Sequence, residues 1–293
     1  MAVMCRYRAC CMLLVTAFLS GSSLVVGKGY AQNRSGTEAN QSSGQRVQQL
    51  LSDDRTEDAE AVRRIFELGN EAVPALVSVS REGTNVESAS RALAYLGGPE
   101  ERKVLREVIA TQKDPEKKWV MAGFLAGALV EPASVEEWGF LESCVKGYNE
   151  EAKGFVSFSA VLALGINASS QALRLLRSVG SPGQRSSSEN DTVEEAGQAI
   201  RWVNQRSLSK ASTSEKGSDS GQIKRTVLRG AFFAGGKSEN VSFEEIAFTK
   251  DRTRALVSLE VSGGNGNPHG YDVVLQRESG MWRITGAWFS WAA

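Results

Sequence analysis

Histidine and cysteine, which supply most metal ligands and many nucleophiles in proteins, are scarce in this chain of 293 residues. His269 is the one histidine, and three of the four cysteines, Cys5, Cys10 and Cys11, lie within the first eleven residues. Zinc sites need several such ligands, and the remaining thiol, Cys144, cannot close a disulfide alone. The sequence therefore predicts no metal and no cofactor, and we interpret Cys144 as a small residue of the core.

An excess of charge is also missing, because 34 basic residues balance 34 acidic ones. Residues 1–31 hold three basic residues and no acidic one, which leaves 31 basic and 34 acidic residues in the rest of the chain. Proteins that bind nucleic acids normally present a basic face. We therefore expect no nucleic-acid partner.

Sequence motifs of catalysis are lacking too. No serine stands in Gly-x-Ser-x-Gly, and residues 235–238, Gly-Gly-Lys-Ser, lack the first glycine of a phosphate-binding loop. Neighbouring carboxylates such as Glu136 and Glu137 point about 100° apart on a helix, so they do not converge on one atom. For His269 and Asp272, proton transfer is weighed against a solvated loop histidine. The prediction is a protein that is not an enzyme, with no catalytic residues.

Long apolar runs are absent except near the start of the chain. A basic start precedes an apolar run over Cys10–Leu19, and residues 29–31, Gly-Tyr-Ala, place small residues where a signal peptidase reads them. We interpret residues 1–31 as a signal peptide and expect an exported protein, periplasmic or secreted and associated with the cell envelope. The alternative is an uncleaved anchor, because residues 24–26 extend the apolar character. After cleavage no stable membrane span is expected.

Helical periodicity dominates the chain between residues 57 and 206. Apolar residues recur there at spacings of three and four, and glycines and prolines separate one short stretch from the next. The stretches form pairs, and the first helices of four pairs end at Leu68, Leu96, Leu129 and Leu164, at intervals of 28, 33 and 35 residues. One pair cannot bury its apolar face alone, so the period predicts stacking into a solenoid.

Local signals mark several helix ends in this stretch. Ser134 with Glu137, and Thr192 with Glu195, have the spacing of capping boxes, which predict helix starts. Gly165 is expected to end the helix that precedes it.

The turn of the first pair resembles a known repeat. Residues 67–77, Glu-Leu-Gly-Asn-Glu-Ala-Val-Pro-Ala-Leu-Val, look like the turn of a HEAT-type repeat, particularly the short HEAT-like class first described in phycobilin lyases. Residues 96–100 and 164–167 are weaker copies, and residues 129–132 lack the turn glycine. The resemblance implies a HEAT-like α-solenoid over residues 57–206. The lyase activity of some members is not implied, because no tetrapyrrole-handling residues can be placed here.

Polar segments without periodicity flank the helical stretch. We expect a disordered linker over residues 32–56 and a flexible linker over residues 207–222. Residues 223–293 then change to a period of two, which is typical of strands. The expected elements are a short helix over Ile223–Phe233, strands around Val241–Thr249, Ala255–Val261, Tyr271–Leu275 and Trp282–Trp288, and a tight turn at residues 278–280. The predicted fold is an α-solenoid of HEAT-like helix pairs followed by a small α+β domain with an antiparallel β-meander.

The last strands carry a second resemblance. Residues 278–284, Glu-Ser-Gly-Met-Trp-Arg-Ile, are similar to the closing strands of NTF2-like and cystatin-like domains. Such domains often form a pocket or dimerise through their sheet. The resemblance implies a homodimer through the C-terminal sheet, and it gives an alternative function, which is binding of a small ligand in a pocket of this domain.

Four arginines are the candidate binding residues of the helical stretch. Arg102, Arg106, Arg174 and Arg177 fall on the second helices of two pairs, which line the concave face in HEAT-like solenoids. They form either a cationic groove for an acidic peptide or a solvated surface.

On the last strand, alternation places Trp282 and Trp288 in the core and Phe289 and Trp291 on the opposite face. The second pair is either an exposed interaction patch or covered by a helix. The function predicted from the sequence is a non-enzymatic scaffold or assembly factor that binds another protein through the solenoid.

Overall fold

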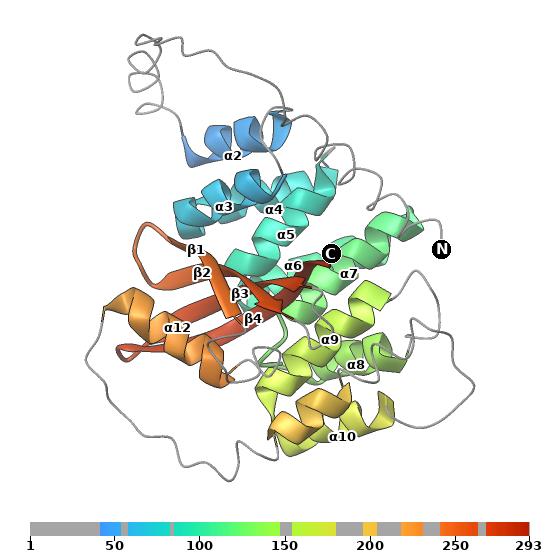
Figure 1. Cartoon of the computed structure of the whole chain (residues 1–293). Coiled ribbons are helices and arrows are strands. Elements are labelled where there is room, and N and C mark those ends of the chain that lie inside the picture. Colours follow the sequence, from blue (N-terminus) through green and yellow to red (C-terminus); the bar gives the residue numbers. More distant parts are fainter. Residues whose placement is uncertain are drawn as a thin grey trace, which may run out of the picture. The chain divides into compact units, whose positions relative to one another are not determined.

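The structure is a computed structural model that describes residues 42–53, 58–82, 85–146, 154–179, 196–203, 218–230, 241–262 and 268–292. The chain divides into two units, Met1–Ser42 and Ser43–Ala293, and the second holds the helices and strands shown in Figure 1. The predicted signal peptide, the predicted capping box of Thr192 and Glu195 and most of both predicted linkers lie outside the described residues.

The helical part precedes a small antiparallel sheet, as expected from the sequence. The helices are α2 (Ser43–Ser52), α3 (Asp58–Leu68), the 3-10 turn η2 (Gly69–Ala72), α4 (Val73–Glu82), α5 (Val86–Leu96), α6 (Pro99–Thr111), α7 (Pro115–Gly127), α8 (Val135–Lys146), α9 (Gly154–Asn167), α10 (Ser170–Val179) and α12 (Asp219–Gly230), and residues 196–203 are also helical.

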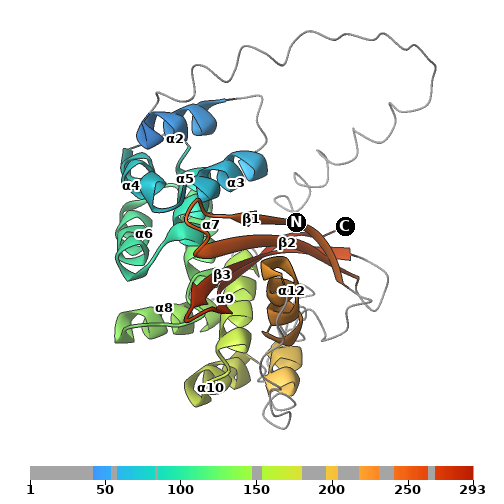
Figure 2. The same ribbon diagram turned by 90° about the vertical axis from the view of Figure 1, so that its left-hand side faces the viewer.

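Successive helices alternate between two rows. Helices α3, α5, α7 and α9 pack on one another in sequence order and form the inner row, which lies next to the sheet (Figure 2). Helices α4, α6, α8 and α10 form the outer row on the side away from the sheet. From α4 onward each helix also packs on a chain neighbour in the other row, and α3 packs on α2, α5 and β1, so the apolar stripe of every helix is buried between two or more partners.

Prolines and glycines shape the helix ends as their backbone chemistry predicts. Pro99 and Pro115 occupy the first positions of α6 and α7, where no N–H is needed, and the Asp114 carboxylate accepts hydrogen bonds from the first turn of α7. Gly69, in the turn between α3 and α4, has a φ of +68°, a conformation that other residues adopt at a cost. The expected end of α9 at Gly165 was wrong, because the helix continues to Asn167, whose side chain donates to the Val130 carbonyl.

The expectation of a disordered linker over residues 32–56 was wrong for Ser43–Ser52, which form α2. Val47 on this helix is fully buried against α3 and α4, and Leu50 and Leu51 pack beside it. The three residues form a short apolar stripe that covers the end of the helical rows. Packing against α3 and α4 therefore stabilises helix α2, and its polar sequence alone gives little indication of a helix.

Four strands form a meander in the order β1-β2-β3-β4, and all neighbours are antiparallel. The strands are β1 (Val241–Phe248), β2 (Arg254–Ser262), β3 (Pro268–Glu278) and β4 (Met281–Ala292). Ser279 and Gly280 both have positive φ between β3 and β4, as a two-residue hairpin turn requires. The predicted hairpin is therefore confirmed.

The regular alternation expected along β4 was wrong. The register with β3 shifts twice, which leaves Thr285 and Ser290 as extra residues in β4. The first bulge exchanges the two faces, so Trp282 and Trp288 lie on opposite sides of the sheet although their spacing is even. Both are buried, at 6 % and 1 % exposure, because each side of the sheet is covered.

Helices cover both sides of the sheet. The inner row packs on the side that carries Trp288 and Asp272, and α12 covers the side that carries Ile284 (Figure 2). Helix α12 begins at Asp219, so the expected linker over residues 207–222 and domain start at residue 223 were wrong for residues 219–222. Helical rows and sheet share one hydrophobic core, so the C-terminal region is not a separate tethered body.

Within the part of the chain that the structure describes, no helix combines the length and apolar character needed to cross a bilayer.

Candidate functional site

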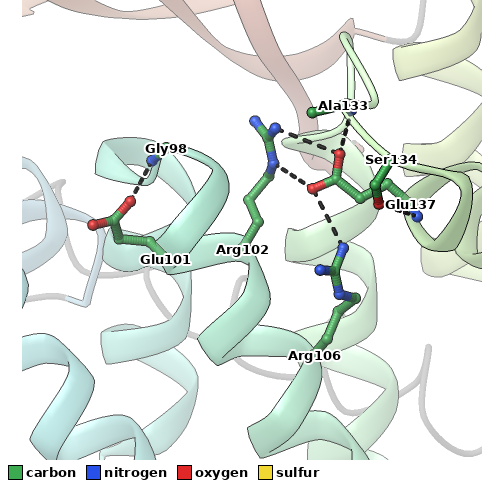
Figure 3. Close-up of polar contacts among 7 residues, drawn as sticks. All are labelled: Gly98, Glu101, Arg102, Arg106, Ala133, Ser134 and Glu137. Atoms are coloured by element: carbon green, nitrogen blue, oxygen red, sulfur yellow. Dashed lines mark hydrogen bonds and ion pairs between the residues drawn. The ribbon is translucent and has the colours of Figure 1, made fainter.

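The candidate site begins with the start of α8, where a capping residue also holds two arginines. Ser134 precedes α8, and its hydroxyl accepts a hydrogen bond from the Glu137 backbone N–H at 3.3 Å. The Glu137 carboxylate accepts from the Ala133 N–H at 2.6 Å, one residue earlier than a standard capping box, and is only 3 % exposed (Figure 3). A buried carboxylate needs a compensating positive charge.

Two arginines of α6 supply that charge. Arg102 Nε donates to Glu137 Oε1 at 2.9 Å, and Arg106 Nη1 lies 3.3 Å from the same oxygen without hydrogen-bond geometry (Figure 3). The side chains of Arg102 and Arg106 are 11 % and 26 % exposed. The cluster therefore joins α6 to α8 within the outer row. Helix α8 follows the turn at residues 129–132, which lacks a glycine. Arg102 in particular has little surface left for a peptide.

Arg174 and Arg177 occupy a different place. They are exposed on α10, which packs on α8 and α9, whereas Arg102 and Arg106 lie on α6, which packs on α4, α5 and α7. The four arginines share the outer row, but the Glu137 carboxylate gathers only the α6 pair. The single cationic groove considered from the sequence is not what this arrangement forms.

The aromatic pair predicted at the end of β4 is also placed differently. Phe289 is half-buried, and its ring lies 5.1 Å from that of Phe158 on α9 and 5.7 Å from that of Tyr271. Helix α9 therefore covers Phe289, which was the alternative considered from the sequence. The side chain of Trp291 lies outside the described residues.

His269 and Asp272 do not form a pair. Three positions apart on β3, they point to opposite sides of the sheet, and the His269 ring lies 6.0 Å from that of Phe289. Asp272 faces the inner row, where it accepts from Arg91 Nη2 at 2.6 Å and from the Tyr95 hydroxyl at 2.7 Å. The proton-transfer pair considered from the sequence is therefore not brought together.

Asp272 instead joins the sheet to the helices. Ser258 on β2 donates to Asp272 Oδ1 at 2.7 Å, and Arg91 also donates to the Tyr95 oxygen at 2.8 Å. Burial raises the pKa of Tyr95 well above its ordinary value, so the hydroxyl keeps the proton that it donates. The spacing of Arg91 and Tyr95, one helical turn apart, was the only sign of this network in the sequence.

Trp288 fills a slot next to this network. Its ring centroid lies 4.5 Å from that of Tyr95, and its indole N–H donates to the Phe124 carbonyl on α7 at 2.8 Å. A Cβ at Gly127 would lie 2.4 Å from the indole, and a Cβ at Gly286 would lie 2.2 Å from it. The two glycines therefore make the space that this side chain occupies.

Cys144 is buried on α8, and burial raises the pKa of its thiol to about 12. Its placement confirms the interpretation as a core residue. The described residues contain no group of three or more His, Cys, Asp or Glu side chains that could hold a metal ion.

The edges of the sheet bear on the predicted homodimer. β1 and β4 are the edge strands, and each carries a bulge, at Glu244 in β1 and at Thr285 and Ser290 in β4. Bulges and charges interrupt the row of free N–H and C=O groups that a second strand would need. A homodimer through this sheet remains a prediction, and its edges do not favour it.

An open depression lies on the outer row between α4 and α6. It has a volume of about 290 Å³ and is lined by Ser80, Arg81, Val86, Val108, Thr111, Gln112 and Lys113. Its residues come from the ends of α4 and α6 and the start of α5, and none belongs to the sheet.

Comparison with protein families, with curated proteins and with solved structures finds no match to this chain.

Proposed function

We propose that the chain is an exported, non-enzymatic scaffold or assembly factor that binds another protein through its outer helical row. In this proposal the two rows form a HEAT-like α-solenoid. The observation that supports it is that the sheet covers one of the two helical rows and leaves the other uncovered. The sheet covers the inner row, anchored by Trp288 and Asp272, whereas the outer row faces away from the sheet (Figure 2).

The polar chemistry of the described residues supports a binding role. The carboxylate of Asp272 is engaged by Arg91, Tyr95 and Ser258, and that of Glu137 by two arginines, so these buried acids stabilise the fold. Stacked helix pairs offer an extended surface, which is the usual means by which solenoid proteins hold partners.

Cross-linking mass spectrometry would test which surface binds. The tagged chain is used to capture partners from an envelope extract and is treated with an amine-reactive cross-linker. Exposed lysines mark each side: Lys103, Lys113 and Lys146 on or next to the outer row, and Lys224 and Lys250 on α12 and the β1–β2 turn. We expect partner cross-links at the first three. Cross-links confined to Lys224 and Lys250 would move the binding surface to the sheet side and contradict the proposal.

A further inference from the structure

The depression between α4 and α6 combines an apolar floor with an unused donor. Val86 and Val108 line it at 9 % and 6 % exposure, which suits the methylene groups of a side chain. The Ser80 hydroxyl lines it as well, is 1 % exposed, and has no hydrogen-bond partner within the described part of the chain. A buried hydroxyl without a partner costs free energy, which a bound acceptor would recover.

The Thr111 hydroxyl and the Gln112 side-chain oxygen of the lining are already engaged. The Thr111 hydroxyl bonds back to the Glu107 and Val108 carbonyls, and the Gln112 side-chain oxygen accepts from the Asp114 N–H. A ligand therefore meets the Ser80 hydroxyl, the Gln112 amide NH2 group and the two cationic side chains of the rim.

The rim is positively charged, and its two cationic side chains are not held by strong ion pairs within the described residues. Lys113 is exposed and forms no ion pair with any residue that the structure describes. Arg81 pairs with Glu107 at 3.3 Å, but both side chains are about half exposed, at 51 % and 55 %. Exposed ion pairs of this kind add little stability, so a ligand carboxylate could replace Glu107.

We propose that this depression binds the carboxylate side chain of a glutamate or aspartate in an acidic segment of the partner protein. The proposal rests on the proposed function and names the chemistry of the partner. The methylene groups of the acidic side chain pack on Val86 and Val108, its carboxylate pairs with Arg81 and Lys113, and the Ser80 hydroxyl donates to it. The volume of about 290 Å³ admits one such side chain.

NMR titration of the full chain with N-acetyl-glutamate amide would test this, with N-acetyl-glutamine amide as the neutral analogue. We expect saturable shifts of the Ser80, Arg81 and Lys113 amide signals with the glutamate compound and none with the glutamine compound. Arg81→Gln or Lys113→Gln should weaken binding at least about fivefold, and Ser80→Ala about fivefold. Arg229→Gln, an exposed arginine in the last turn of α12 and outside the depression, is the matched control and should bind like the natural chain.

Absence of saturable shifts, or equal shifts with both compounds, would overturn the proposal. So would full binding by both Arg81→Gln and Lys113→Gln. The captured partner separates the two proposals: a partner cross-linked to the outer row and still held by Arg81→Gln and Lys113→Gln contradicts the depression but leaves the proposed function intact. If the natural chain captures nothing while the titration succeeds, the depression stands and the scaffold function fails.

Discussion

At the scale of single residues, the buried side chains of Glu137 and Cys144 contribute more to the fold than the exposed side chains considered from the sequence. The sequence predicts Glu137 as part of a helix cap and as one of two adjacent carboxylates. In the fold it is the shared counter-ion of two arginines on another helix. Cys144 is a free cysteine that packs in the core.

Glu137→Gln should lower the free energy of unfolding by about 2–3 kcal/mol, because Arg102 and Arg106 lose the buried carboxylate that compensates their burial. The amide can still accept from the Ala133 N–H, so the loss reports on the ion pairs. Urea unfolding followed by circular dichroism measures it. Glu136→Gln, the exposed neighbour, should leave the urea midpoint nearly unchanged. Equal midpoints for the two variants would show that the cluster contributes no stability.

Cys144 should resist thiol reagents in the folded protein, because its raised pKa of about 12 leaves almost no thiolate at pH 8. The measurement uses Cys5, Cys10 and Cys11 replaced by serine, with labelling by a chromogenic disulfide before and after urea is added. The folded pKa lies above the unfolded value of about 9, so this group stabilises the fold fully below pH 9. That contribution is lost as the pH rises toward 12, and Cys144→Ala should lack this part of the decline. Rapid labelling without urea would contradict the prediction.

At the scale of elements, contact between helices and sheet depends on small residues. Helix α7 presents Gly123 to Phe155 of α9 and Gly127 to Trp288 of β4, and in both places a Cβ would lie within 2.5 Å of the ring. Helix α7 therefore contacts α9 at Gly123 and β4 at Gly127, and these two glycines lie one helical turn apart.

Gly127→Ala should destabilise the protein by about 1–3 kcal/mol, because the new methyl group meets both the indole and the Ala287 carbonyl, and backbone cannot move aside cheaply. Thermal unfolding measures the change. The matched control is Gly139→Ala on α8, where a Cβ meets nothing within 4 Å and the better helix former should stabilise by about 0.5–1 kcal/mol. Similar changes in both variants would argue against a tight slot at Gly127.

Whether an element can be predicted from the sequence depends on how far along the chain the stabilising interactions reach. Helix ends set by Pro99, Pro115 and Ser134 were predicted, because caps act within one turn. Helix α2 was missed because its stability comes from α3 and α4. The exchange of faces in β4 was missed because one bulged residue changes the parity of every later position, and nothing in the composition marks Thr285.

The candidate binding side chains show the same limit. The four arginines lie on α6 and α10 of the outer row, but the partner of Arg102 and Arg106 lies on another helix. Asp272 lies near His269 in the sequence, whereas its partners Arg91 and Tyr95 come from a helix far away in the chain. Contacts of this kind depend on tertiary packing, which one sequence does not contain.

At the scale of the whole molecule, the helical rows and the sheet within Ser43–Ala293 share one core. Trp288, Asp272 and Arg254, which donates to the Leu96 carbonyl at the end of α5, reach from the sheet into the inner row. Two separate domains on a tether would leave these groups without partners.

Urea unfolding should therefore show one cooperative transition, with the same midpoint for helix content by far-ultraviolet circular dichroism and for tryptophan fluorescence. Gly127→Ala should lower both midpoints together. Two separated transitions would mean that helices and sheet are stable independently.

The slot formed by Gly127, Gly286 and Trp288 has a consequence for how the sequence can change over evolutionary time. Shrinking the tryptophan first opens room and costs only packing, after which a larger side chain at either glycine becomes tolerable. Enlarging a glycine first has no such route, because the indole is already there. The three positions are therefore bound to a particular order of substitution, and descendants of this protein should keep all three or lose the indole before the glycines.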